Sequence, residues 1–174
     1  QEVWRIMTRK ISLYAVITAL TVAVSMVFII PVPATNGFVT LADAGIYIAS
    51  LLFGPIGGLT VGALSGGLID LLSGYPQWLV FSLLIHGGQG WLAGHFFNKN
   101  KKMQTLGLLL ASLLMISGYA LATSWLYGVG AGIASLPGNI IQSLFGVIVA
   151  LPLSQTLKRV LPKNGRLEER RMNK

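Results

Sequence analysis

The chain has 174 residues, of which 53% are hydrophobic and only 10% are charged. Soluble domains usually contain about 25% charged residues, so this composition excludes an ordinary soluble domain and indicates an integral membrane protein. The formal net charge is +8 and cysteine is absent, which excludes a disulfide framework and a thiolate metal site.

Basic residues divide the chain into apolar intervals. All 13 Lys and Arg fall in three clusters: Arg5, Arg9 and Lys10; Lys99, Lys101 and Lys102; and Lys158 to Lys174. Short loops rich in Lys and Arg stay cytoplasmic, so each interval must hold an even number of spans of about 20 apolar residues. The net charge is then a juxtamembrane band facing anionic lipid, not a nucleic-acid footprint, because no basic patch interleaved with aromatic residues appears.

We therefore predict an all-α bundle of six transmembrane helices with both termini in the cytoplasm. The helices are expected at about 10–30, 40–54, 56–72, 77–97, 104–127 and 137–158, in a single transmembrane domain over 1–174 with a basic cytoplasmic tail, 158–174. No small-residue cleavage motif follows the first apolar segment, so we interpret it as an anchor and not a signal peptide.

The first predicted helix has an alanine at every fourth position, at Ala15, Ala19 and Ala23. This spacing puts three small side chains on one face, which lets another helix approach closely in lipid. Packing inside the bundle and docking of a second protein both explain the stripe.

The second predicted helix follows an uncharged loop, 32–39. Thr40 and Asp43 have the spacing of a capping box, in which Asp43 would bond the first-turn amides at the positive end of the helix dipole. A carboxylate at the centre of a membrane helix costs about 2.5 to 3.5 kcal/mol, so ligand binding is the other explanation for Asp43.

The third predicted helix combines small residues with a second carboxylate. Gly58, Gly62 and Gly66 form a face that predicts tight packing against another helix. Asp70 lies in the last turn, where the dipole disfavours a negative charge and no cap role is available. A polar neighbour or a ligand must therefore bond Asp70.

Polar residues also mark the last three predicted helices. Trp78 opens the fourth helix at the interface, and His86 and Gln89 are three residues apart on one face. A lone buried histidine usually bonds a backbone carbonyl, but ionisable groups inside membranes are usually functional, which favours a site. The other candidates are Tyr119 in the fifth helix and Asn139 and Gln142 in the sixth.

These polar groups all fall in the outer halves of their predicted helices, while the inner halves are nearly featureless. A channel or a proton-coupled carrier would need polar groups along its whole path. We therefore expect a cavity open only to the outside that captures a small polar or aromatic molecule, and we expect no metal ion or other cofactor.

Several features, taken together and in order, resemble one known family. They are the alanine stripe, the segment from Asn36 to Asp43, the turn Leu52-Phe-Gly-Pro-Ile-Gly-Gly58, the motif Gly66-Gly-Leu-Ile-Asp70, and Pro137-Gly-Asn-Ile-Ile-Gln142. Across essentially its whole length the chain resembles the substrate-binding S component of an energy-coupling factor (ECF) vitamin transporter, a family of small six-helix membrane proteins with cytoplasmic termini.

The resemblance implies a division of labour in the plasma membrane of a prokaryote. The S component binds a vitamin or precursor, a separate transmembrane T component docks on the alanine stripe, and two ABC-type ATPases supply energy. Consistently, the chain has no G-x-x-x-x-G-K-[ST] phosphate loop. Segment 36–43 is most similar to S components for hydroxymethylpyrimidine or pyridoxine. The substrate-binding residues expected are Asn36, Asp43, Asp70, Trp78, His86, Gln89, Tyr119, Asn139 and Gln142.

Two alternatives stay open on the sequence. An intramembrane enzyme could use Asp70 and His86 as an acid-base pair, although no serine nucleophile motif or metal cluster accompanies them. A stand-alone secondary carrier would show inverted repeats, and none is apparent in the sequence.

Overall fold

The computed structural model describes residues 2–160, and within that range the fold is all-α apart from one short hairpin. The elements in order are α1 Glu2–Val27, β1 Ile30–Val32, η1 Pro33–Thr35, β2 Gly37–Val39, α2 Ala42–Leu72, η2 Pro76–Trp78, α3 Leu79–Gly94, α4 Lys101–Tyr127 and α5 Val129–Val160. In this part of the chain α1, α2, α4 and α5 are long and apolar enough to cross a membrane. Most of the tail predicted at 158–174 lies outside the described residues.

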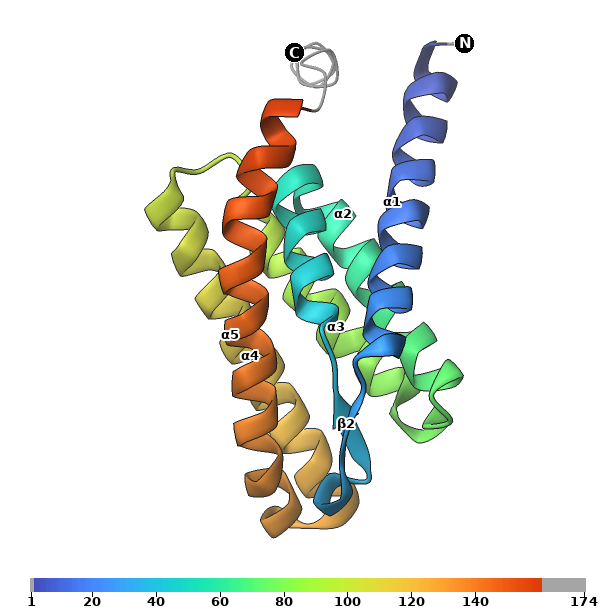
Figure 1. The fold of residues 1–174 in the computed structure, drawn as a ribbon, viewed down its shortest axis with the longest axis vertical. Coiled ribbons are helices and arrows are strands. Elements are labelled where there is room, and N and C mark those ends of the chain that lie inside the picture. The colour runs from blue at the N-terminus through green and yellow to red at the C-terminus, as the bar shows by residue number, and fades with distance from the viewer. Residues whose placement is uncertain (1, 161–174) are drawn as a thin grey trace.

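Helix α2 folds back on itself at Gly54. There the backbone leaves the helical region, with φ 75° and ψ −162°, and Pro55 follows. Glycine reaches positive φ without steric cost, and proline cannot supply the amide of a continuous helix. Ile46 Cγ2 lies 3.3 Å from where a Cβ on Gly62 would stand, a contact that a straight helix rising 1.5 Å per residue could not make. The break falls at the turn predicted between helices 40–54 and 56–72, and the reversal is visible in Figure 1.

The first helix begins and ends earlier in the chain than the predicted range 10–30. Helix α1 spans Glu2–Val27, and Ile30 already belongs to β1, where it pairs with Val39 of the antiparallel strand β2. The residue before a proline is disfavoured in the helical region, so Pro31 explains why Ile30 is extended. The loop predicted at 32–39 is therefore mostly a hairpin.

The predicted start of the last helix is wrong by two turns. Helix α5 begins at Val129, so the segment 128–135 is mostly helical and not a loop, and Pro137 lies inside the helix. Proline suits the first turn of a helix, which is why the sequence favours a helix starting at 137. Membrane helices tolerate internal proline because neighbouring groups satisfy the freed carbonyl. Helix α3 is shorter than the predicted 77–97, since a separate turn, η2, precedes it.

The two ends of the bundle differ in charge. Figure 1 shows the start of α1, the end of α5 and the connection from α3 to α4 at one end, and the β1–β2 hairpin at the other. The basic residues described in or beside these three segments are Arg5, Arg9 and Lys10, Lys99, Lys101 and Lys102, and Lys158 and Arg159. Lys158 Nζ donates to the carbonyl of Phe97 at 3.0 Å, which links the end of α5 to the connection from α3 to α4. The hairpin end has no Lys or Arg among residues 28–98.

The half of the bundle nearer the termini is filled with apolar side chains. A buried cluster joins α2, α3, α4 and α5; its members are Tyr47, Leu51, Ala93, Leu108, Ala111, Val147 and Ala150. Packed side chains in this region leave little room for water. An aqueous path therefore does not continue from the hairpin end through this cluster.

The glycine face predicted on the third helix packs against α3, as expected. A Cβ on Gly58 would collide with the carbonyl of Gly90, and one on Gly62 with the carbonyl of His86. Only glycine permits such close approach of two helix backbones. This contact holds the second half of α2, which ends near Asp70, next to the part of α3 that contains His86.

Candidate functional site

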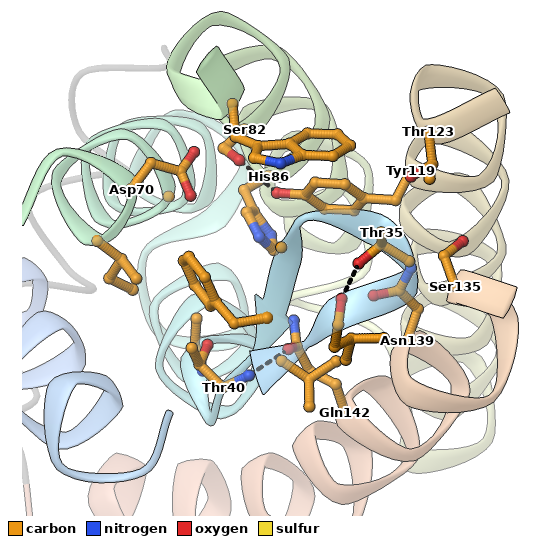
Figure 2. Close-up of a pocket in the computed structure, with 18 residues that line it drawn as sticks. Thr35, Thr40, Asp70, Ser82, His86, Tyr119, Thr123, Ser135, Asn139 and Gln142 are labelled. Atoms are coloured by element: carbon orange, nitrogen blue, oxygen red, sulfur yellow. Dashed lines mark hydrogen bonds between the residues drawn. The ribbon is translucent and has the colours of Figure 1, made fainter. Parts of the chain in front are cut away.

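A cavity lies at the hairpin end of the bundle, between the hairpin and helices α2 to α5 (Figure 2). The volume that the centres of water molecules can occupy inside it is about 50 Å³. Its polar lining consists of Thr35, Thr40, Asp70, Ser82, His86, Tyr119, Thr123, Ser135, Asn139 and Gln142, and its aromatic lining also includes Phe38 and Trp78. No Lys or Arg lines it within the described range.

Trp78 forms one wall and holds the hairpin over the cavity. Its indole Nε1 donates to the carbonyl of Asn36 at 3.0 Å, and its ring lies 5.8 Å from that of Tyr119, centroid to centroid. Asn36 adopts a left-handed conformation with φ 46°, which closes the turn between β1 and β2. The side chain of Asn36 is exposed and does not line the cavity, so Asn36 acts here through its backbone, contrary to the prediction.

Asp43 does not form the predicted capping box. Helix α2 begins at Ala42 without a side-chain cap, and the Thr40 hydroxyl accepts from the Ala42 amide instead. Asp43 is fully buried and its carboxylate accepts three hydrogen bonds, from Gln89 Nε2 at 2.7 Å, Gln142 Nε2 at 2.9 Å and Ser143 Oγ at 2.6 Å. These bonds compensate for burying the charge. Asp43 therefore joins α2, α3 and α5 behind the cavity wall.

Gln89 connects this carboxylate to the cavity. Its amide nitrogen donates to Asp43 and, at 2.9 Å, to the hydroxyl of Tyr47, while its Oε1 lies 2.7 Å from His86 Nδ1. Gln89 is fully buried and does not line the cavity, whereas the ring of His86 does. The shared helix face predicted for His86 and Gln89 is thus confirmed as a hydrogen-bonded pair.

Asp70 is the second buried carboxylate of α2 and, unlike Asp43, it lines the cavity. It is 5% exposed, and Oδ2 has no hydrogen-bond partner among residues 2–160. A buried carboxylate oxygen without a partner destabilises the fold by its full desolvation penalty, because no hydrogen bond replaces those it made to water. A ligand that donates to Asp70 would supply the missing bond, which is one of the two explanations that the sequence left open.

The structure brings together six of the nine predicted substrate-binding residues. Those that line the cavity are Asp70, Trp78, His86, Tyr119, Asn139 and Gln142; those that do not are Asn36, Asp43 and Gln89. Sequence reasoning missed several lining residues, among them Thr35, Phe38, Thr40, Ser82 and Ser135. Single hydroxyl and aromatic residues in apolar segments give no distinctive signal. Thr123 also lines the cavity and is four residues from Tyr119, a spacing that puts both on one face of α4.

The alanine stripe lies on the outside of the bundle. Ala15, Ala19 and Ala23 are exposed, while Val22 of α1 packs with Ile46 of α2. Within the described residues the stripe therefore lies on the surface of the bundle, which favours the second of the two explanations offered by the sequence, docking of another protein.

Comparison with known proteins identifies the family. The family model described as "ECF-type riboflavin transporter, S component" matches residues 5–159. The chain belongs to this family. The S component is 39% identical over 158 residues to the "Thiamine precursor transporter HmpT" of Lactococcus lactis subsp. cremoris, a match covering 90% of this chain and 92% of the relative. It is also 34% identical over 137 residues to an "Uncharacterized protein in gap 3'region" of Pyrococcus woesei, covering 78% of this chain and 92% of that one.

Family membership decides between the functions left open by the sequence. The chain is an S component, the substrate-capture subunit of an ECF-type importer of vitamins or their precursors, and a multi-pass protein of the cell membrane. It is a transport subunit and not an enzyme, so the hypothesis of an acid-base pair of Asp70 and His86 is wrong.

Proposed function

We propose that this S component captures hydroxymethylpyrimidine, a thiamine precursor, from outside the cell and delivers it to the rest of an ECF transporter. The observation that carries the proposal is the cavity itself, which is small, walled by aromatic rings and lined by uncharged hydrogen-bonding groups plus one carboxylate. A ring with amino and hydroxyl substituents suits such a lining, since aromatic walls favour stacking and a few polar groups fix orientation.

The size of the cavity favours a single ring over the three fused rings of riboflavin. The centre of one bound water needs roughly 10 to 15 Å³ of free volume. The cavity offers about 50 Å³ of such volume, which is room for a few waters or a small ring. The name of the Lactococcus relative, a thiamine precursor transporter, supports the same choice.

The charge of the lining argues against acidic ligands. Folate, biotin and pyridoxal phosphate carry carboxylate or phosphate groups, which proteins usually bind with Arg or Lys. The described lining has neither, and it has a carboxylate of its own, Asp70. Backbone amides at a helix N-terminus can bind anions, but here the Thr40 amide is already bonded to Gln142.

The orientation follows from the charges at the two ends of the bundle. We infer that the end with the termini faces the cytoplasm, because short basic segments stay inside, and that the cavity therefore opens outside. Counting α2 as two spans, on either side of Gly54, and α3 as one gives six spans and two cytoplasmic termini. The connection from α3 to α4 then lies on the cytoplasmic side with the termini.

Transport requires partners that this chain does not supply. We propose that the T component docks on the exposed alanine stripe of α1, where small side chains allow close approach of another helix, and that two ABC-type ATPases supply the energy. The exposure of Ala15, Ala19 and Ala23 supports this role.

Calorimetry on purified protein tests the choice of ligand. The panel is hydroxymethylpyrimidine, pyridoxine, thiamine, riboflavin and pantothenate, each titrated into detergent-solubilised protein. We expect one equivalent of hydroxymethylpyrimidine to bind most tightly, with no product formed. Tighter binding of riboflavin, or no binding of either pyrimidine or pyridoxine, would reject the proposal.

A further inference from the structure

The buried carboxylate of Asp43 determines how the amide of Gln89 is oriented. A carboxylate that receives three hydrogen bonds is an acceptor only, and its neighbours Gln142 and Ser143 already donate to it. If the Gln89 amide were flipped, its carbonyl oxygen would lie 2.7 Å from Asp43 Oδ2, and two acceptors would face each other without a proton. The amide nitrogen must therefore face Asp43.

A second chain of hydrogen bonds fixes the same orientation independently. The hydroxyl of Ser112 donates to the carbonyl of Leu108 at 2.9 Å, so the Tyr47 hydroxyl must donate to Ser112 Oγ at 2.7 Å. The Tyr47 oxygen is then left to accept, and its donor is the Gln89 amide nitrogen at 2.9 Å. Both protons of that nitrogen are assigned, one to Asp43 and one to Tyr47.

The orientation of Gln89 in turn decides which nitrogen of His86 carries the proton. Gln89 Oε1 is an acceptor only, and it lies 2.7 Å from His86 Nδ1. His86 must therefore donate from Nδ1. In a neutral ring the other nitrogen, Nε2, then has a free lone pair, and among the described residues no group is bonded to it.

Asp70 presents a second acceptor to the same cavity. Figure 2 shows the His86 ring and the Asp70 carboxylate pointing into the cavity from α3 and α2. Asp70 Oδ2 has no partner within residues 2–160. Two acceptors cannot bond each other without a proton between them, so a ligand with two donor groups would satisfy both.

We propose that Asp43 and Gln89 are positioning residues that hold His86 as its Nδ1–H tautomer, so that His86 Nε2 and Asp70 form an acceptor pair selecting ligands with two donor groups. The ligand class is a small aromatic nitrogen heterocycle that carries two exocyclic amino or hydroxyl donors. Hydroxymethylpyrimidine, with one amino and one hydroxymethyl group, belongs to it. The ligand class rests on the proposed function, whereas the tautomer does not.

Nitrogen NMR on the ligand-free chain tests the tautomer directly. Protein labelled with ¹⁵N-histidine at pH 8 gives signals from only two rings, because the chain has two histidines, and His95→Gln assigns them. We expect His86 to show a protonated Nδ1 and an unprotonated, pyridine-type Nε2. A protonated Nε2, in either the other tautomer or the imidazolium form, would overturn the proposal without requiring any variant to fold.

A pair of variants separates positioning from simple packing. Gln89→Leu removes the acceptor next to Nδ1, so His86 should lose its single tautomer and give averaged nitrogen shifts. Tyr47→Phe removes a hydroxyl from the same network but leaves Asp43 to orient Gln89, so the wild-type tautomer should persist. An unchanged tautomer in folded Gln89→Leu, or a changed one in Tyr47→Phe, would contradict the assignment.

Ligand analogues test the acceptor pair. The affinity of wild-type protein is measured for hydroxymethylpyrimidine, for its analogue without the amino group, and for its methyl ether, which lacks the hydroxyl donor. Each analogue should bind about 10- to 100-fold more weakly, as expected for loss of a bond to a charged or strongly polar group. Undiminished affinity for either analogue would overturn the acceptor pair and leave the proposed function standing. If hydroxymethylpyrimidine itself failed to bind, the proposed function would fall while the NMR result still judged the tautomer.

Discussion

The side-chain amide of Gln142 donates from Nε2 to Asp43 Oδ1 at 2.9 Å, which ties α5 to the start of α2 directly behind the cavity. The other end of the same amide, Oε1, accepts from the backbone of Thr40 at 2.6 Å. One side chain thus fixes both a buried carboxylate and the backbone where β2 leads into α2. Gln142 and Thr40 line the cavity and Asp43 does not, so the site has a layer of residues that line the cavity and a layer behind them that holds them in place.

The two carboxylates of α2 should respond differently to the same substitution. Asp43→Asn leaves one acceptor oxygen facing three donors, so we expect the free energy of unfolding to fall by about 1.5 to 3 kcal/mol, the usual value of a hydrogen bond to a charged group. Asp70→Asn breaks no bond to Oδ2, so its stability should change little while its ligand affinity falls. Reversible unfolding in detergent measures the first quantity and calorimetry the second. Equal destabilisation by the two variants would contradict the two-layer description.

Removing polar side chains that line the cavity should weaken ligand binding. We expect His86→Ala and Asn139→Ala each to lower affinity about 10-fold, corresponding to the loss of a hydrogen bond worth roughly 1.4 kcal/mol. Gln104→Ala is the matched control, because Gln104 is buried and bonds the Phe97 carbonyl near the other end of the bundle. Unchanged affinity in both cavity variants would mean that the ligand binds elsewhere.

Enlarging the alanine stripe should separate transport from binding. Ala19→Leu should abolish vitamin uptake by cells that express the complete transporter, because the larger side chain bars close approach of a partner helix. Ligand affinity of the isolated chain should stay at the wild-type value, since Ala19 is exposed and does not line the cavity. Ala134→Leu makes the same change at an exposed position of α5 and should leave uptake intact. Normal uptake by Ala19→Leu would reject this face as the docking surface.

Close packing of α2 on α3 should tolerate no added methyl group. Gly58→Ala places a Cβ against the carbonyl of Gly90, so we expect a loss of stability of about 1 to 3 kcal/mol, typical of overpacking. Gly130→Ala is the control, since nothing lies within 4 Å of its added Cβ. The unfolding midpoints of the two variants in detergent compare them directly, and a similar midpoint for both would show that the helices can separate at little cost.

Several features of the site were predictable from the sequence for local reasons. His86 and Gln89 share a face because they are three residues apart on one helix, and Asp70 lacks a cap role because it ends a helix. The glycine face of α2 likewise follows from spacing alone. By contrast, Thr40 and Asp43 have the spacing of a capping box, but the capping role predicted for Asp43 from that spacing was wrong.

The sequence by itself determined that the chain is a membrane protein, which family it belongs to, and that its polar groups gather toward one end of the helices. Hydropathy and charge act residue by residue, so they can be read along the chain. Only the tertiary structure decided that Asp43 supports the cavity without lining it, that Asn36 acts through its carbonyl, and that α5 begins before Pro137. Those outcomes depend on partners that are distant in the chain, as with Gln142, which lies 99 residues from the carboxylate it bonds. A buried polar group takes whatever donor the fold brings to it.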